Sequence, residues 1–576
     1  MIIRVHILFF ILFLVFQAHG ETLTVQQALQ NAYDTGELTR AEYVAYQLQA
    51  LRGPERLPEE WRGYPAQVSR KGTLLAAEAK RLLDHAHGHE QQVLQKALSR
   101  PANLDQSIQS PSGRFRIHYT LSGPDSSDPD FIRKIAATFD QMYHFEVDTL
   151  GFNPPPPDQG VDGNEWDVYV HNIYDYGWTT AEYEVLSTDK PYDYTGFIEM
   201  DNDFSHTFTT GDEAMRVTVA HELFHLIQMG YRSYQTTQLD PVWLFESCSV
   251  WMEDMAYDSV NDYFQYLSYY FLHLHNSLHI SNGLREYGLG LFHFMLTKKY
   301  GRSIIRDIWE AFETREAIEA VDHVLQNYGS SLTQEVVDHA IWNFYTGERA
   351  DSVRFYSEGA HYPELESVND LILDENMLID EQLALYAAAY FKVGLATLGR
   401  VTISPAFEAA ENWMYISFLP QFNHSFDYYV SPGQDPHMIT ASVLTDFWIA
   451  AVNIEQPTTD QTYLKRPYSL EMDMSNQQKL ESSIVSLFPN PYKIDDHIQG
   501  IQCCIRLTQE SDNCIVSIYS SSGRLVRRQE LGYRPAGDFV YVWDGQDDAG
   551  KSVSSGIYIL GLNVNSIKPQ KIAIVR

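Results

Sequence analysis

The sequence predicts a multidomain protein in which an α+β domain, with a mixed sheet lobe and a helical lobe, is followed by β-sandwich domains. The chain has 576 residues, which is several times the usual length of one domain. Strand-like alternation is followed by helical periodicity up to about residue 347. From about residue 370 the chain consists of short alternating stretches separated by Asn, Pro and Gly turns, as in β-sandwiches.

The first residues have the pattern of a secretory signal peptide. A short basic start is followed by an apolar run from Ile7 to Phe16 and by small residues at Ala18 and Gly20. The pattern predicts that residues 1–20 are removed and that the mature protein is secreted, either to the medium or to a bacterial cell surface. The apolar run is too short to span a bilayer comfortably, so we expect no membrane insertion.

The composition is strongly acidic, with a formal net charge of −35 at pH 7. Nucleic acids and anionic membranes bind basic patches, so this charge argues against both as partners. An acidic surface would suit cationic substrates or a salty medium. The chain has only four cysteines, too few for a disulfide scaffold, so packed cores must stabilise it. No feature of the sequence indicates an oligomeric state.

Residues 21–100 are predicted to be helical. Two capping boxes begin a helical hairpin, and a third helix is predicted over residues 73–83. The boxes pair Thr24 with Gln27 and Thr39 with Glu42. Because this segment precedes a larger domain in an exported chain, it is either a pro-segment that folds onto that domain or an accessory helical domain.

The larger domain is predicted over residues 113–347. It begins with a half-buried strand at Phe115–Tyr119 and a helix at Asp130–Leu150. Two more strands follow, Trp166–His171 and Thr195–Met200, before the helical lobe. Further helices are predicted over residues 217–228, 241–253, 258–274, 304–315 and 331–344.

The helix over residues 217–228 carries the motif His221-Glu222-x-x-His225. Residues four apart lie on one face of a helix, so both imidazoles can bind one metal ion about 2.0–2.1 Å away, with Glu222 beside them. The motif is a signature of zinc metallopeptidases. A catalytic zinc ion needs a third protein ligand and a water molecule, whose proton a neighbouring carboxylate takes. The alternative is a core helix with two buried histidines.

A second helix is predicted after the helix breaker Gly230. Asp240 is a typical N-cap, and Pro241 suits the first helical position. A carboxylate on this helix would supply the third zinc ligand, and Glu246 is the candidate. Cys248 is another candidate ligand, although a small buried residue is the more frequent role of such a cysteine.

The two helices resemble those of the gluzincins, the thermolysin-like and zinc-aminopeptidase group. The second gluzincin helix carries the ligand glutamate in a Trp-x-x-Glu-(Gly/Ser) turn, which residues 243–247 match. Glu253 matches a second acidic position that is common in the aminopeptidase branch. The chain is also similar, almost position by position, to a group of secreted bacterial metalloproteases. The similar stretches are residues 220–231, 243–254 and 258–263.

This resemblance covers roughly residues 115–301 and implies a gluzincin-like α+β fold that holds Zn²⁺. The implied zinc ligands are His221, His225 and Glu246. Glu222 is implied as the general base and then the proton donor. Tyr287, in a Tyr-x-x-Gly stretch, is implied to donate its hydroxyl to the developing oxyanion. A structural tyrosine is the alternative for Tyr287.

The gluzincin resemblance also bears on how substrates bind. It implies that the last strand, residues 195–200, is an edge to which the substrate backbone adds. Zinc aminopeptidases carry Gly-x-Met-Glu-Asn at this place, and residues 196–202 resemble that segment only loosely, which favours an endopeptidase. The chain departs from the pattern in a longer interval between His225 and Glu246 and in Ser247, which replaces the usual glycine. Neither departure removes a ligand.

The C-terminal part is predicted to be all β. Residues 370–475 read as a β-sandwich without recognisable chemistry. Residues 484–576 combine strands with Gly- and Asp-rich turns, which is typical of an immunoglobulin-like sandwich. This stretch, with the segments 488–492 and 543–550, resembles the C-terminal sorting domains of type IX secretion substrates and the related domain of a flagellar hook-capping protein. The resemblance implies the secretion machinery as a partner.

Three further clusters contain residue types that bind metals. They are His85-His87-His89, His273-His275 and Asp544-Asp547-Asp548. We expect the first to lie in a solvated linker, the second to be core or surface residues and the third to be turn residues, so no metal is assigned to them.

Together these features predict a secreted zinc metalloendopeptidase that hydrolyses protein or peptide substrates. Other functions remain open. The chain could be a catalytically inactive, surface-displayed binding or adhesion protein on a metallopeptidase scaffold. It could also be a zinc aminopeptidase, or a hydrolase of a non-peptide substrate.

Overall fold

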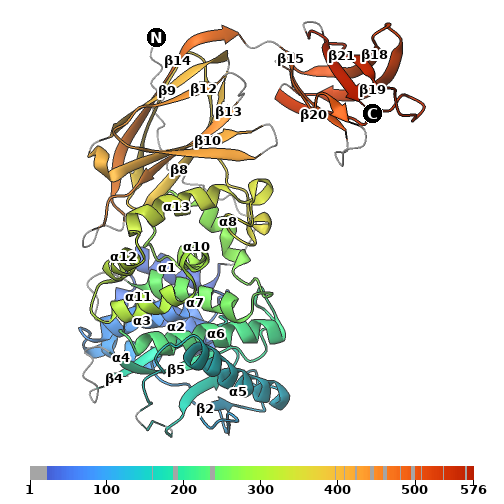
Figure 1. The fold of residues 1–576 in the computed structure, drawn as a ribbon. Coiled ribbons are helices and arrows are strands. Elements are labelled where there is room, and N and C mark those ends of the chain that lie inside the picture. The colour runs from blue at the N-terminus through green and yellow to red at the C-terminus, as the bar shows by residue number, and fades with distance from the viewer. Residues whose placement is uncertain are drawn as a thin grey trace. The chain divides into compact units, whose positions relative to one another are not determined.

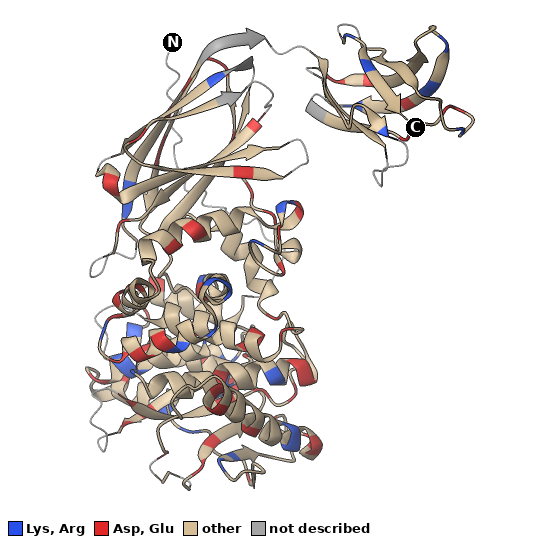
Figure 2. Ribbon diagram, viewed as in Figure 1, with Lys and Arg blue, Asp and Glu red and all other residues tan. Residues whose placement is uncertain are grey.

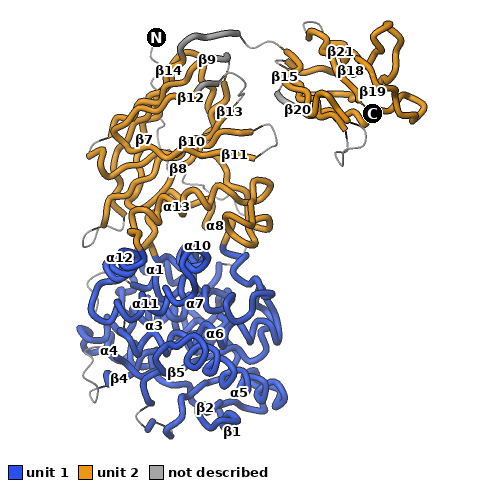
Figure 3. Tube along the Cα trace, in the orientation of Figure 1, with its two compact units in different colours: residues 1–266, 281–328 blue, residues 267–280, 329–576 orange. Residues whose placement is uncertain are grey.

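The computed structural model describes residues 23–158, 160–161, 163–185, 193–233, 241–395, 397–407, 409–421, 425–441, 446–457, 463–479, 482–493, 500–507, 509–535, 537–564 and 567–575. The predicted signal peptide and the predicted N-cap Asp240 lie outside the described residues. The chain divides into two units (Figure 3). The first comprises the residues up to 266 together with 281–328, and the second comprises 267–280 and 329–576.

The first unit begins with helices that share one hydrophobic core. They are α1 (Val25–Asp34), α2 (Arg40–Leu51), α3 (Gly72–Leu83) and α4 (Gly88–Ala97). Both predicted capping boxes are present, at Thr24 and Thr39. The core of these helices extends to Ile173 and Trp178 of the adjoining sheet region. The N-terminal helices therefore pack onto the rest of this unit through buried apolar side chains.

The prediction of a linker at residues 85–89 is wrong at its C-terminal end. Helix α4 begins at Gly88 and includes His89. The side chains of His85, His87 and His89 are all exposed. The helix was missed because neither its N-cap residue, His87, nor its first turn carries a side chain that caps it.

The sheet of the first unit has the strand order β1-β2-β3-β5-β4. Its strands are β1 (Gln106–Gln109), β2 (Phe115–Tyr119), β3 (Trp166–Val170), β4 (Gly177–Glu184) and β5 (Tyr194–Met200). The pairs β2–β3 and β3–β5 are parallel, and β4 is antiparallel to β5. The sequence-based expectation that residues 195–200 form the edge is therefore wrong, because β4 pairs with the outer side of β5 and is itself the edge.

Helices pack beside this sheet (Figure 1). Helix α5 (Pro129–Tyr143) continues into a π-helical turn (His144–Thr149) and lies against α6 (Gly211–Met229), which contacts both β4 and β5. The other helices of the first unit are α7 (Val242–Ala256), α9 (Arg285–Gly288), α10 (Gly290–Tyr300), α11 (Ser303–Phe312) and α12 (Ala317–Asn327). Helix α13 (Leu332–Phe344) and most of α8 (Phe264–Leu272) belong to the second unit. The aromatic run predicted as one helix over 258–274 is helical only in α8.

Two packed sheets follow in the second unit. One has the order β11-β10-β13-β8-β6 and the other β12-β9-β14-β7. The strands are β6 (Asp370–Leu373), β7 (Asn376–Ala384), β8 (Ala387–Leu395), β9 (Thr397–Phe407), β10 (Trp413–Pro420), β11 (Phe426–Pro432), β12 (His437–Ala441), β13 (Asp446–Asn453) and β14 (Lys465–Lys479). A single hydrophobic cluster, which includes Phe391, Trp413 and Leu470, lies between them. This part is a β-sandwich.

The C-terminal part of the second unit again has two sheets around one core. Their orders are β15-β17-β20 and β16-β22-β21-β18-β19. The strands are β15 (Ser483–Phe488), β16 (Tyr492–Lys493), β17 (Ile501–Leu507), β18 (Ser511–Ser520), β19 (Leu525–Arg534), β20 (Gly537–Trp543), β21 (Gly556–Leu562) and β22 (Gln570–Val575). The core includes Ile505, Ile518 and Trp543. The protein thus combines an N-terminal α/β part with C-terminal β-sandwich-like sheets.

Acidic residues are spread over the helices and strands of both units, with Lys and Arg interspersed (Figure 2). All four cysteine thiols are free. None of the helices in the described part of the chain has the length and apolarity that crossing a bilayer requires.

Candidate metal centre

Two buried helices position the predicted ligands. Helix α6 is buried on every side from Val217 to Met229, and α7, which packs against it, is buried from Val242 to Asp254. Helix α7 begins one residue later than predicted, with Pro241 just before its first turn. Because both helices are enclosed, packing rather than solvent fixes the directions of their side chains.

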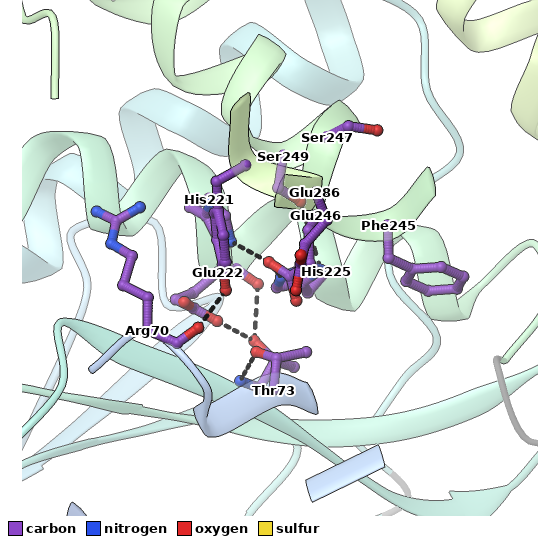
Figure 4. Close-up of polar contacts among 12 residues, drawn as sticks. Arg70, Thr73, His221, Glu222, His225, Phe245, Glu246, Ser247, Ser249 and Glu286 are labelled. Carbon is purple, nitrogen blue, oxygen red and sulfur yellow. Dashed lines mark hydrogen bonds and ion pairs between the residues drawn. The ribbon is translucent and has the colours of Figure 1, made fainter. Parts of the chain in front are cut away.

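His221 and His225 on α6 and Glu246 on α7 come together (Figure 4). The Nε2 atom of His221 lies 3.1 Å from Glu246 Oε2, and the Nε2 atom of His225 lies 3.6 Å from the same oxygen. The three side chains are 4%, 0% and 0% exposed. The structure therefore brings all three predicted ligands to one buried point.

This donor set fits a zinc ion. Two imidazole nitrogens and one carboxylate are ligands that zinc takes, and a tetrahedral ion with ligands about 2.0–2.1 Å away holds them roughly 3.3 Å from each other. Within the described residues, His225 Nε2 and Glu246 Oε1 have no hydrogen-bond partner although both are buried. Buried polar atoms without partners are costly, and a bound cation would satisfy them.

The other ring nitrogens are held by side chains that orient the imidazoles. His221 Nδ1 lies 2.7 Å from Glu253 Oε1, and His225 Nδ1 lies 2.7 Å from Gln228 Oε1. Such contacts direct both Nε2 atoms to the centre. Burial lowers the pKa of His221, but the Glu246 and Glu253 carboxylates accept hydrogen bonds from its ring and raise that pKa to about 10. The carboxylates of Glu246 and Glu253 thus stabilise a positive charge close to His221.

Gln228 was not singled out from the sequence, and it provides a test of the geometry. We expect Gln228→Ala to weaken zinc affinity by about 10- to 100-fold, because His225 loses the acceptor that orients its ring. Titration with a competing zinc chelator measures this. The control is Gln326→Ala, which removes an exposed glutamine from α12 and should leave the affinity unchanged. Equal affinity in both variants would contradict the orienting role.

Glu222 lies beside the three ligands and is not one of them. Its Oε2 accepts a hydrogen bond of 2.8 Å from the Thr179 hydroxyl on the edge strand β4. Gly177 allows this approach, since a Cβ atom there would lie 2.7 Å from the Glu199 carbonyl oxygen and 3.3 Å from Glu222 Cγ. Burial raises the pKa of Glu222, although the two imidazoles lower it. A carboxylate with a raised pKa is suited to general base catalysis.

A small cavity connects Glu222 with His221. It has a volume of about 10 Å³, room for about one water molecule. The cavity is lined by Arg70, Gly72, Thr73, Asp175, Tyr176, Gly177, Thr218, His221, Glu222 and Tyr287. A water molecule there would be within reach of both Glu222, the general-base candidate, and His221, a predicted ligand.

Tyr287, from the short helix α9, is brought to the same place. Its ring stacks on that of His221 at 6.1 Å between centroids and 21° between planes. Its hydroxyl donates to the main-chain carbonyl of Arg70. Burial, together with the nearby Glu246, raises the pKa of Tyr287, so the hydroxyl stays protonated and able to donate. The predicted oxyanion donor therefore lies at the centre.

Comparison with known proteins identifies two regions. Residues 125–346 match a family of unknown function, DUF6055, and residues 496–566 match the FlgD Ig-like domain. The chain carries an FlgD Ig-like domain at its C-terminus. We call residues 125–346 the DUF6055 region. It contains the candidate metal centre and all the residues that line the cavity except Arg70, Gly72 and Thr73. None of the curated proteins compared matches the chain significantly.

Solved structures with local similarity include FlgD from P. aeruginosa, at 24% identity, 16% coverage of this chain, 66% of that chain and a TM-score of 0.12. PorZ of the type IX secretion system of Porphyromonas gingivalis matches at 20% identity, over 19% of this chain and 14% of that chain, with a TM-score of 0.13. The lysozyme inhibitor PliG from Aeromonas hydrophila matches at 11% identity, over 19% and 100%, with a TM-score of 0.14. The chain thus spans less than two thirds of the FlgD and PorZ chains.

Cys248, the alternative ligand in the DUF6055 region, points away from the centre. Its Sγ lies 3.5 Å from His293 Nε2, which also contacts the Ser247 hydroxyl at 2.8 Å. Burial raises the pKa of the thiol, which therefore stays neutral. Glu246 and Cys248 are two positions apart on α7 and thus face different neighbours. Cys248 is a core residue.

A second cluster in the DUF6055 region consists of Asp201, Asp203 and His206. The Asp201 carboxylate already accepts hydrogen bonds from the N–H groups of Ile173, Asp203 and Phe204. His206 Nε2 lies 2.8 Å from the Ile173 carbonyl. These contacts describe a turn, and no metal is assigned to it.

Three acidic residues of the FlgD Ig-like domain also accept hydrogen bonds from main-chain N–H groups. Asp544 accepts from the N–H of Gln546, Asp547 from those of Ala549 and Lys551, and Asp548 from that of Arg528. They are turn residues, as the sequence indicates.

The predicted pair His273 and His275 lies in the second unit. His273 Nδ1 contacts the Tyr269 carbonyl, and its ring lies 5.8 Å from that of His275.

Proposed function

We propose that the DUF6055 region is a zinc-dependent metallopeptidase domain of the gluzincin type, and that the protein is an endopeptidase. The observation that carries the proposal is the convergence of His221, His225 and Glu246, which each place one ligand atom within 4.8 Å of the others, with Glu222 beside them. Two further observations support a bound cation. Within the described residues, the buried His225 Nε2 and Glu246 Oε1 atoms have no hydrogen-bond partner. The Nδ1 atoms of both histidines are held by neighbouring side chains. Protein or peptide substrates are proposed on the motif and its resemblance.

The geometry supports the following roles for the residues. A zinc ion held by the ligands would polarise a substrate carbonyl and lower the pKa of a water molecule. Glu222 accepts a proton from that water as its oxygen attacks the carbonyl carbon, and then gives the proton to the leaving amine. Thr179 holds the carboxylate of Glu222 in position. The Tyr287 hydroxyl donates to the carbonyl oxygen as negative charge develops on it.

We also propose that the protein is exported. The pattern of residues 1–20 supports a signal peptide. Residues 496–566 match the FlgD Ig-like domain. The sequence resemblance of the same C-terminal stretch to type IX sorting domains supports delivery to the cell surface or medium by that secretion machinery. Appending residues 484–576 to a signal-peptide-bearing reporter should send the reporter to the medium of a type IX-competent host, whereas retention in the periplasm would contradict the sorting role.

The zinc proposal is tested by elemental analysis of the purified protein, paired with cleavage of quenched peptides. We expect about one zinc ion per chain, and cleavage that a chelator stops and added zinc restores. The peptides are assayed before and after the chain is cut within residues 101–105, which separate α4 from β1. Absence of zinc would show that the helix pair has been misread. Zinc without cleavage in either state would favour a non-catalytic scaffold.

A further inference from the structure

The candidate metal centre is closed on the side that a polypeptide has to enter. Within the described residues, the cavity beside His221 and Glu222 has room for only about one water molecule, which is far too little for a peptide. Arg70, Gly72 and Thr73 form part of its wall. These residues belong to the N-terminal helical segment, which we define as residues 23–100. This segment has to move before a peptide can reach Glu222.

The N-terminal helical segment also covers the edge of β4. The N–H of Thr179 donates to the Thr73 hydroxyl oxygen at 3.4 Å, and Lys80 Nζ donates to the Glu182 carbonyl at 2.7 Å. A peptide that binds by strand addition uses such edge N–H and C=O groups. The segment therefore occupies the groups that an extended substrate would use.

The main chain of residues 70–72 is held as a bound peptide would be. The Tyr287 hydroxyl donates to the carbonyl oxygen of Arg70. The Asp175 carboxylate accepts from the N–H groups of Lys71 at 3.2 Å and Gly72 at 3.1 Å. The proposed oxyanion donor is thus already engaged with a peptide carbonyl.

The side chain of Arg70 fills an acidic and aromatic pocket. Its Nη1 lies 3.1 Å from Glu253 Oε1, and its Nη2 lies 2.9 Å from Asp262 Oδ2. The guanidinium lies 3.9 Å from the ring centroid of Tyr176 and 5.9 Å from that of Tyr266. A planar guanidinium can stack on a ring while donating to two carboxylates, which an ammonium cannot do equally well.

We propose that residues 70–73 are an internal pseudosubstrate, and that the pocket around the Arg70 side chain is the subsite for an arginine side chain of the substrate. The proposal rests on the proposed function and adds its regulation and substrate preference. The N-terminal helical segment keeps the site latent. Once it is displaced, Glu253 and Asp262 lose their cation, and an arginine of a substrate replaces it.

The first test displaces the segment in the full chain with Gly72→Val. A Cβ atom at Gly72 would lie 2.7 Å from the Trp178 side chain, so the segment must shift away from β4. The control is Gly63→Val, where a Cβ atom meets nothing within 4 Å. We expect a chelator to remove zinc at least about tenfold faster from Gly72→Val than from the control or wild type, because the site opens more often. Equal rates would overturn the closure.

A second preparation keeps the test valid if Gly72→Val fails to fold. A site for a specific protease is placed within residues 101–105 of the otherwise unchanged chain, which is cut after folding. Zinc removal is then compared before and after the cut, with a mild denaturant to release the segment. Faster removal only after the cut supports the proposal, and unchanged removal overturns it.

The third test concerns the subsite and does not need hydrolysis. Glu222→Gln is added to the opened protein, and calorimetry compares a peptide containing one arginine with the same peptide containing glutamine. We expect the arginine peptide to bind at least about 30-fold more tightly, as for a buried charge pair, and Asp262→Asn to reduce this ratio. Equal binding would overturn the subsite. Preferential binding by a protein that cleaves no peptide when Glu222 is present would support the subsite and contradict the proposed function.

Discussion

Glu222→Gln is expected to lower the rate of peptide cleavage by at least about 10²- to 10⁴-fold, the usual contribution of a general acid–base group, while zinc stays bound. The substitution keeps the shape of the side chain, and its amide oxygen can still accept the hydrogen bond from Thr179. It removes the group that accepts and returns the proton. Since Glu222 is not one of the ligands, the zinc content should remain that of the wild type.

The measurement compares turnover and zinc content in the same preparation, with the N-terminal helical segment displaced. Glu213→Gln is the matched control, because Glu213 is exposed in the first turn of the same helix, α6. It should keep both zinc and turnover. A Glu222→Gln protein that cleaves peptides at the wild-type rate would rule out the proposed mechanism.

Glu246→Ala is expected to lose zinc almost completely. The carboxylate lies within 3.1 Å and 3.6 Å of the two Nε2 atoms and is the acidic member of the ligand set. Burial raises the pKa of Glu246, but the two imidazoles beside it lower that pKa by more, so the side chain favours its ionised form. Without it only the two histidine nitrogens remain, fewer than the three protein ligands that catalytic zinc sites use.

Cys248→Ala distinguishes the two ligand candidates on α7. It removes a buried thiol that faces His293, so we expect the zinc content to be unchanged. Elemental analysis of the two variants side by side is sufficient. Zinc retained by Glu246→Ala and lost by Cys248→Ala would contradict the ligand assignment.

The parts that could be predicted from the sequence depend on short-range geometry. A spacing of four residues is enough to place His221 and His225 on one face of a helix. The capping boxes at Thr24 and Thr39 depend on residues three apart. The turns of the C-terminal FlgD Ig-like domain are likewise local. Glu246 could be predicted as the third ligand because α7, which carries it, is the next helix after α6 in the chain.

The parts that were missed depend on contacts between distant residues. Strand β4 has the sequence GWTTAEYE, which lacks a clear apolar alternation, so neither the strand nor Thr179 was expected. The gluzincin resemblance implies an edge at residues 195–200, but β4 pairs with that strand and takes the edge position. Arg70 forms ion pairs with Glu253 and Asp262, which lie about 190 residues further along the chain. No local sequence pattern predicts a contact between residues so far apart.

The cover on β4 also affects how copies of the protein behave toward one another. An uncovered edge strand offers its N–H and C=O groups to any other extended chain, including the same strand of a second copy. Thr73 and Lys80 occupy such groups at Thr179 and Glu182. While the N-terminal helices are in place, the β4 edge is therefore protected from pairing with another copy, and their removal exposes an edge strand prone to self-association.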